Sequence, residues 1–359
     1  MARIYNFSAG PAVLPEEVLV EAQAQLVDYR GSGMSIMEMS HRGKEYMAVQ
    51  AEAEANIRKL IGIPDEYAVL FLTGGASGQF AMIPMNLLGA DQVADYTHSG
   101  SWAGKAIKEA KLFGKVNLAA DVSKDKPSRM PVASELKWTE GAVYAHITSN
   151  ETIEGTQWKN FPTATAPLVA DMSSDILSRP LDVKQFGLIY AGAQKNMGPA
   201  GVTLVIIRKD LAEKVSDKIP VIHRYKTHIE NESMYNTPPC FPIYVVMLVT
   251  RWLLKLGGLT AMQKINEQKA AVLYSAIDGG GFYKGTSAAA FRSLMNVTFR
   301  LPSEELEEKF IKEASALGLK GLKGHRSVGG IRASIYNAFP AAGVDALVSF
   351  MKEFEKKNG

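Results

Sequence analysis

The sequence predicts an α/β protein in which a mainly parallel sheet is flanked by helices. Three observations lead to this fold class. Short apolar strand patterns alternate with helical patterns along most of the chain, which is typical of such sheets. The 359 residues are 47% hydrophobic, enough for a large core and, by length, for about two domains. A charged content of 21% and a mean hydropathy of −0.04 are those of an ordinary globular protein.

The first predicted domain, residues 16–258, begins with helices and continues into strands. Pro15 followed by two glutamates signals a helix start, because acidic side chains in the first turn favour the helix dipole. An amphipathic helix is expected over 42–61, and another from about Ser77. Sequence alone does not give the spatial order of the strands. We expect one sheet from seven apolar strand patterns, at residues 67–72, 92–96, 115–119, 142–147, 167–170, 186–191 and 202–208.

The second predicted domain is a smaller C-terminal α/β unit, residues 259–359. The pattern changes near Gly257, after which a long helix is expected over 259–277. Two strands are expected at 296–300 and 330–336, on either side of a helix over 303–317, and a final helix from Gly343.

Charge and cysteine content exclude several classes of protein. The net charge is +3, from 40 basic and 37 acidic residues that are dispersed along the chain, so nothing favours a nucleic-acid or membrane partner. Cys240 is the one cysteine, which excludes an internal disulfide framework, and the prolines around it suggest a packed loop residue. The longest apolar stretch, 241–254, is interrupted by Pro242 and Arg251 and is too short to span a bilayer. No signal peptide is recognised, and we expect a cytoplasmic protein.

Two ionisable residues follow neighbouring strand patterns. Lys195 lies in a turn of small residues after 186–191, and Asp171 closes the preceding strand pattern. Taken singly, each has a simple structural interpretation, as a surface lysine in a turn and a helix-capping aspartate. Together they are what pyridoxal 5'-phosphate (PLP) requires. The lysine amine holds the cofactor as a Schiff base, and the aspartate keeps the pyridine nitrogen protonated.

Two further features support a cofactor site. A glycine-rich turn, 73–79, lies between a strand and a helix, where backbone amides can approach an anion. The alternative is a tight turn without a ligand. With Lys195 and Asp171 present, we favour a phosphate cradle from the amides of Ala76 and Ser77. Trp102 opens the next helix, and two interpretations are open: its indole stacks on the pyridine ring, or it is a core tryptophan. The family resemblance described below favours stacking.

Several segments carry a resemblance to one family, the phosphoserine aminotransferases. These segments occur in family order and cover the chain from end to end. They are NFSAGPAVLP (6–15), MEMSHRGKEY (37–46), SNETIEGTQW (149–158), the ungapped stretch 169–202, NTPPCFPIY (236–244) and GHRSVGGIRASIYNA (324–338).

The resemblance implies fold type I of the PLP-dependent transferases, with residues 1–15 packing on 259–359 as a small domain. It also implies reversible amino transfer between O-phospho-L-serine and 2-oxoglutarate, giving 3-phosphohydroxypyruvate and L-glutamate. The pathway implied is serine biosynthesis, and in many bacteria the family also serves pyridoxine biosynthesis. The sequence does not decide this second role.

Roles for individual cofactor-binding residues follow from the same resemblance. Lys195 carries PLP and moves a proton between the substrate Cα and the cofactor, while Asp171 pairs with the pyridinium. Gln194 contacts the PLP phosphate, and Thr152 bonds the phenolic oxygen. The remaining contacts to the phosphate come from the partner chain of a homodimer with shared active sites, through Asn236 and Thr237.

Cations for a dianionic substrate are implied in the same way. Arg332 is expected to take the α-carboxylate, because arginine grips a carboxylate with two parallel hydrogen bonds. The distal anion is expected to meet two His-Arg pairs, His325-Arg326 and, from the other subunit, His41-Arg42. Many family members carry arginine where this chain has Ser77, which leaves open how the anionic ligands are balanced. No metal-ligand spacing is present, and His98, His146, His223 and His228 receive no role.

Three alternatives compete with this interpretation. The first is another fold-type I enzyme, a cysteine desulfurase or an alanine–glyoxylate type aminotransferase. Cys240 between prolines is a poor nucleophile for a desulfurase, and small uncharged substrates do not explain the second set of cations. The second is a nucleotide-binding oxidoreductase, which would leave Lys195 idle, and no G-x-G-x-x-G motif follows a strand. The third is a non-catalytic binding protein, which is disfavoured because every catalytic position is filled.

Overall fold

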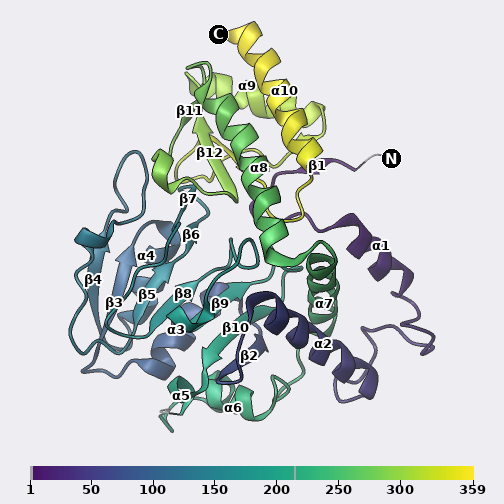
Figure 1. The fold of residues 1–359 in the computed structure, drawn as a ribbon, viewed down its shortest axis with the longest axis vertical. Coiled ribbons are helices and arrows are strands. Elements are labelled where there is room, and N and C mark those ends of the chain that lie inside the picture. Colours follow the sequence, from purple (N-terminus) through teal and green to yellow (C-terminus); the bar gives the residue numbers. More distant parts are fainter. Residues whose placement is uncertain (1–2, 214–215) are drawn as a thin grey trace.

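The computed structural model describes residues 3–213 and 216–359. Its central element is a seven-stranded sheet (Figure 1). The strand β10 runs antiparallel to both of its neighbours, whereas the other neighbouring pairs are parallel. The predicted mainly parallel α/β fold is therefore confirmed. In spatial order the strands are β2 (Tyr67–Leu72), β10 (Thr203–Arg208), β9 (Phe186–Gly192), β8 (Leu168–Asp171), β5 (Ala145–Thr148), β3 (Val93–His98) and β4 (Lys115–Asp121).

The seven strands are those expected from the sequence, because the central ones are continuous apolar runs. Every residue of β2, β9 and β8 is buried, as expected for strands covered on both faces. The bounds of β2 match the expected ones, and the ends of the other strands differ by up to three residues. The largest difference is at the pattern 142–147, of which only the part from Ala145 onward is strand.

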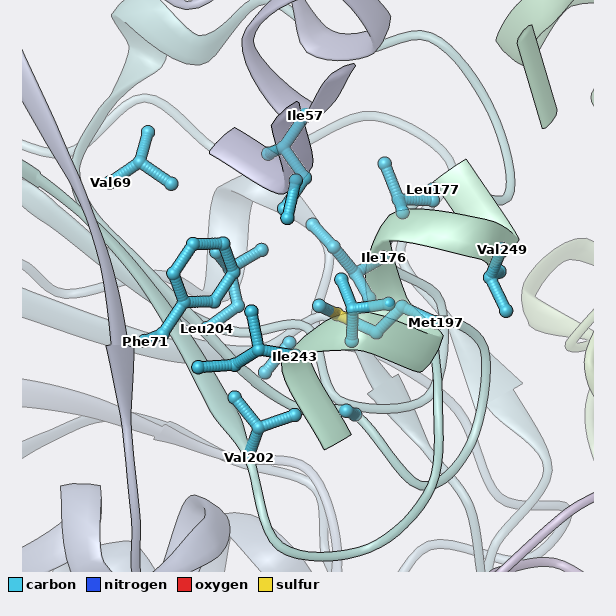
Figure 2. Close-up of a cluster of buried hydrophobic side chains, with 14 of the residues drawn as sticks. Ile57, Val69, Phe71, Ile176, Leu177, Met197, Val202, Leu204, Ile243 and Val249 are labelled. Carbon is cyan, nitrogen blue, oxygen red and sulfur yellow. The ribbon is translucent and has the colours of Figure 1, made fainter. Parts of the chain in front are cut away.

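Helices cover both faces of the sheet. On one face lie α2 (Lys44–Ile61) and α7 (Cys240–Lys255). Figure 2 shows Ile57 and Ile243 from these helices near Phe71 and Leu204 from the strands, with Val249 of α7 at the edge of the same cluster. The opposite face is covered by α3 (Gly75–Leu87), α4 (Ser101–Ala110), α5 (Lys209–Ala212) and α6 (Tyr225–Glu230).

Helix α7 corrects an expectation from the sequence. Cys240 was interpreted as a loop residue, but it is the first residue of α7, and its thiol lies 3.3 Å from the carbonyl of Pro238. Pro242 does not break the helix, because it lies in the first turn, where its missing N–H has no partner to lose. No single helix in the described ranges is long and apolar enough to cross a membrane. Helix α7 and the next helix, α8 (Gly258–Asp278), meet that test only when they are counted together, across a bend of 84°.

Helix α1 (Glu16–Ala24) is shorter than the helical pattern after Pro15 suggested. The chain leaves the helix so that Tyr29 can enter the core, where its ring meets that of Tyr244 edge-on at 5.7 Å. The hydroxyl of Tyr244 also donates to Gln25 Oε1 at 2.9 Å. Tertiary packing therefore overrides the local helical preference here.

The C-terminal part of the chain forms a second core. A three-stranded antiparallel sheet, β11 (Lys284–Gly285), β12 (Asn296–Arg300) and β14 (Ile331–Ser334), packs with α8 (Gly258–Asp278), α9 (Glu304–Ala316) and α10 (Ala341–Asn358). The N-terminal strand β1 (Tyr5–Asn6) pairs in parallel with β13 (Leu319–Lys320). Short elements complete the fold: the hairpin β6 (Asn150–Glu151) and β7 (Thr156–Gln157), and 3₁₀ turns at Ala133–Glu135, Val183–Gln185, Val221–His223 and Ala289–Phe291.

The predicted division into residues 16–258 and residues 1–15 with 259–359 stays a prediction. The hydrophobic clusters are compatible with it, since Phe7 belongs to the same cluster as the C-terminal sheet. Helix α8 serves both cores. Leu259 at its start packs in the cluster of α2 and α7, whereas Leu273 packs in the C-terminal cluster.

Buried asparagines join the two cores. The backbone N–H of Asn337 donates to Asn196 Oδ1 at 3.0 Å, and its side-chain amide donates to the carbonyl of Leu177 at 2.8 Å. Asn266 from α8 donates to Asn337 Oδ1 at 2.9 Å. Because Asn196 directly follows Lys195 and Asn337 follows β14, these bonds fix the segment after β9 relative to the C-terminal sheet.

A buried lysine reinforces the same junction. Lys269 from α8 is 2% exposed, and its Nζ donates to the carbonyls of Ile335 (3.0 Å), Tyr336 (2.7 Å) and Phe339 (3.1 Å). These carbonyls lie just beyond β14. One side chain therefore supplies donors that three buried acceptors need.

Replacing this lysine tests the junction. Lys269→Met keeps an apolar stem but leaves buried carbonyls without donors, so we expect the free energy of unfolding to fall by about 2–3 kcal/mol. The measurement is the urea midpoint with its slope. Lys264→Met, on the exposed side of α8, is the control and should change little. Equal effects of both substitutions would show that the carbonyl contacts do not stabilise the junction.

Candidate active site

The carboxyl ends of the parallel strands meet along one edge of the sheet, the usual place for a ligand in such folds. A cavity of about 310 Å³ lies there. It also reaches the N-terminal segment, through Gly10, and the region around β14. The predicted site residues that line it are Ala76, Ser77, Trp102, Thr152, Asp171, Gln194, Lys195, His325 and Arg332.

Lys195 follows β9 and projects its amine into this cavity. Its Nζ donates to Thr152 Oγ1 at 2.7 Å. Burial lowers the pKa of Lys195 to about 8, and the nearby carboxylates of Asp171 and Glu151 act against that change. A larger fraction of the amine is therefore neutral near physiological pH than for a lysine in water, which is what a nucleophile or base needs.

Asp171 ends β8 and is 4% exposed. Its Oδ1 accepts bonds from the backbone N–H of Ser173 at 2.9 Å and from the Ser173 hydroxyl at 2.6 Å. Burial raises the pKa of Asp171, whereas the bonds from Ser173 lower it. In the part of the chain that the structure describes, no cation forms an ion pair with this carboxylate. A cationic ring nitrogen in the cavity would supply the missing charge.

The start of α3 offers backbone donors to the same cavity. Gly74 and Gly75 have φ of 90° and 64°, and the first helical bond runs from Gly78 to the carbonyl of Gly74. The amides of Gly75, Ala76 and Ser77 therefore precede the hydrogen-bonded helix. The first turn contains no acidic residue and no side-chain cap, so an anion is favoured there.

Trp102, in the first turn of α4, lies on another side of the cavity. The ring centroid is 5.3 Å from Lys195 Nζ and 3.9 Å from Lys105 Nζ. The backbone N–H groups of Trp102 and Ala103 donate to the carboxylate of Glu151, at 3.1 and 3.2 Å. That carboxylate is fully buried and also accepts from Ser99 Oγ at 3.1 Å.

Glu151 and Glu154 are site residues that the sequence analysis missed. Glu154 accepts bonds from the backbone N–H of Ser101 at 2.9 Å and its hydroxyl at 2.6 Å. The two glutamates together cap the N-terminus of α4 and so position Trp102. Both lie in the NETIEG segment, but nothing local to it reveals that it meets a helix some 50 residues earlier.

Five predicted residues do not line this cavity. Arg42, Asn236, Thr237 and Arg326 are exposed, and His41 is half-buried. Arg326 lies close enough to His325 to influence the pKa of its imidazole. Burial lowers this pKa, and the charges of Arg332 and Arg326 lower it further. Asn236 lines a neighbouring cavity of about 180 Å³ beside Gly74. Their predicted roles stay predictions.

Comparisons with known proteins agree with the fold. The family model of class-V aminotransferases matches residues 4–347. The phosphoserine aminotransferase of Herpetosiphon aurantiacus is 56% identical over 358 residues, covering 99% of each chain. The solved phosphoserine aminotransferase from Bacillus circulans subsp. alkalophilus superposes with a TM-score of 0.96 at 54% identity, covering 99% of each chain. A PLP-bound phosphoserine aminotransferase from Trichomonas vaginalis gives 0.94 at 42% identity, covering 98% of this chain and 100% of that one.

The fold and the family model define a class-V aminotransferase. At more than half identity over the whole length, the chain belongs more narrowly to the phosphoserine aminotransferase family. The family resemblance predicted from the sequence is therefore confirmed.

The buried glutamate under Trp102 gives a pH-dependent prediction. Burial raises the pKa of Glu151 above its ordinary 4.5, and Glu154 adds to the effect. The folded protein therefore holds this proton more tightly than the unfolded chain does, and the residue's contribution to stability falls as the pH rises above that value. Glutamine does not titrate. The difference in melting temperature, Glu151→Gln minus parent, should therefore increase as the pH rises from about 5 to about 8. Thermal unfolding at several pH values measures this, and a constant difference would contradict the assignment.

Proposed function

We propose that this protein transfers an amino group reversibly between O-phospho-L-serine and 2-oxoglutarate, giving 3-phosphohydroxypyruvate and L-glutamate. The observation that carries the proposal is the placement of Lys195, Asp171 and Arg332 around one cavity, in a chain 56% identical to a phosphoserine aminotransferase over its whole length. The activity belongs to L-serine biosynthesis, and we propose that it takes place in the cytoplasm.

The residues of the cavity fit PLP. The amides of Ala76 and Ser77, with Gln194, would hold its phosphate, because the start of α3 is free of acidic groups. Asp171 would face the pyridine nitrogen, and Thr152 the phenolic oxygen. When bound, PLP supplies an aldehyde that condenses with amines and an electron-poor ring that stabilises negative charge at the substrate Cα.

The protein's own groups then have separate tasks. The Lys195 amine, with its lowered pKa, would take the proton from Cα of the amino donor and, in the second half-reaction, deliver a proton to Cα of the amino acid formed from the oxo acid. Thr152 holds that amine in place through the 2.7 Å bond. Arg332 binds the α-carboxylate that every amino acid substrate carries, and His325 with Arg326 meets the distal anion. With Ser77 in place of an arginine, the cradle at α3 depends on backbone donors.

We also propose a homodimer in which each site takes residues from both chains. The segment that carries His41 and Arg42 exposes large apolar side chains, including Val27 at 84% and Met37 at 57%. Such a concentration on one segment is typical of an interface. A second copy covering it would bring Arg42 to the distal-anion pocket of the partner. It would also bring the exposed Asn236 and Thr237 to the place where the partner would hold the PLP phosphate.

Substrate choice can be tested with three amino donors. Arg326→Ala removes a bond to the distal anion, so kcat/KM for phosphoserine and glutamate should fall by about tenfold to over a hundredfold. The slow transamination of alanine, which has no distal anion, should be nearly unchanged. Arg332→Ala should depress all three donors, and Arg332→Lys should rescue only in part because it lacks the planar fork. Equal losses for alanine and phosphoserine in Arg326→Ala would remove that arginine from the distal pocket.

Shared sites can be tested by subunit exchange. Lys195→Ala and Arg42→Ala should each be inactive alone. After mixing and exchange, one site of each mixed dimer would carry both intact residues, so part of the activity should return. The readout is phosphoserine transaminase activity before and after exchange, with exchange followed by mass. No recovery despite complete exchange would show that each chain builds its site alone.

A further inference from the structure

A second cavity, of about 230 Å³, adjoins the first one and shares Ile153, His325 and Arg332 with it. Its lining includes one carboxylate, that of Glu154, among several cationic side chains. A negative charge beside a pocket for anionic substrates weakens anion binding unless it has a specific task. The contacts of Glu154 indicate what that task is.

The two oxygens of Glu154 have different surroundings. Oε1 is held by the N–H and hydroxyl of Ser101, at 2.9 and 2.6 Å. Oε2 is buried and has no hydrogen-bond partner among the described residues. The cap on α4 therefore uses half of the carboxylate, and the other half remains available to a donor.

Arg332 offers the complementary atom. Its Nε is also buried without a hydrogen-bond partner among the described residues, and its side chain lines both cavities. Burial lowers the pKa of Arg332, whereas Tyr336 and Glu154 act in the opposite direction. Glu154 thus stabilises the charged guanidinium although the two groups form no direct ion pair.

A guanidinium has two usable edges, one with Nη1 and Nη2 and one that includes Nε. A carboxylate attracting the Nε edge leaves the Nη edge for a substrate carboxylate, with its plane already set. We propose that Glu154 is a positioning residue that orients Arg332 for the substrate α-carboxylate. This inference rests on the proposed function, in which Arg332 binds that carboxylate.

The inference has a consequence that a capping role alone does not have. Every substrate carries the α-carboxylate, so loss of the Glu154 charge should weaken all of them by a similar factor. A ligand without a carboxylate should not be weakened. Inorganic phosphate, which has no carboxylate and resembles the distal anion of phosphoserine, provides that comparison.

Glu154→Gln separates the charge from the cap, because the glutamine oxygen can still accept from Ser101. With PLP-loaded protein, KM for phosphoserine and for glutamate should rise by about threefold to thirtyfold, with kcat changed by less than about twofold. The dissociation constant of 2-oxoglutarate should rise by a similar factor. The oxo acid cannot react with an enzyme that holds no amino group, so this constant reports binding alone. The dissociation constant of inorganic phosphate should stay the same or fall.

Two further variants complete the test. Glu154→Asp keeps the charge and should restore part of the lost affinity. Glu304→Gln is the matched control, because Glu304 is an exposed partner of Arg300, which lines the same cavity. It should leave every constant unchanged. Melting temperatures confirm that each variant is folded. If the glutamine variant is not, Glu154→Asp is compared with the parent instead: its shorter side chain moves the charge away from Arg332, so the dissociation constant of 2-oxoglutarate should rise and that of inorganic phosphate should not.

The outcomes distinguish this inference from the proposed function. If the parent protein does not convert phosphoserine and 2-oxoglutarate, the proposed function is wrong whatever the variants do. If the parent is active and a folded Glu154→Gln keeps its KM, or loses phosphate binding as much as 2-oxoglutarate binding, only the role of Glu154 is wrong.

Discussion

Burial of the Asp171 carboxylate at the end of β8 is the constraint on which the site depends. A carboxylate in a dry environment is costly unless it is hydrogen-bonded or paired with a cation. Ser173 meets part of this need, since it bonds Asp171 Oδ1 and also accepts from the N–H of Gly192 at 3.1 Å. It thereby ties the ends of β8 and β9 together. The charge of the neighbouring Lys195 lowers the pKa of Asp171, and in the proposed function a cationic ring nitrogen held by Lys195 would supply the remaining charge.

The rest of the fold keeps this pair in register with Arg332. The strands β8 and β9 are parallel neighbours, so the residues that follow them open onto the same edge of the sheet. Arg332 belongs to another sheet, which shares no strand with the first. The buried bonds of Asn337 to Asn196 and the carbonyl contacts of Lys269 fix that second sheet against the turn of Lys195. Precision at the site therefore comes from polar contacts at the junction as well as from apolar packing.

The sequence predicted best what depends on local pattern. The seven strands are apolar runs, and Lys195 and Asp171 stand where two of them end, so their proximity follows from the parallel arrangement. Features that depend on distant contacts were missed. Helix α7 was overlooked because Pro242 looks like a breaker until its place in the first turn is known. Glu151 and Glu154 cap a helix from another part of the chain. The roles predicted for Arg42 and Asn236 belong to the proposed dimer, and no pattern within one chain shows where a second chain would place them.

The central claim is that PLP binds in this cavity and is held by Lys195. The most direct measurement is to incubate the protein with PLP, reduce it with borohydride, digest it and locate the cofactor by peptide mass spectrometry. The account predicts one labelled peptide, containing Lys195, and loss of that label in Lys195→Ala. Stable labelling at Lys184 or Lys226 instead, with Lys195 unmodified, would contradict it.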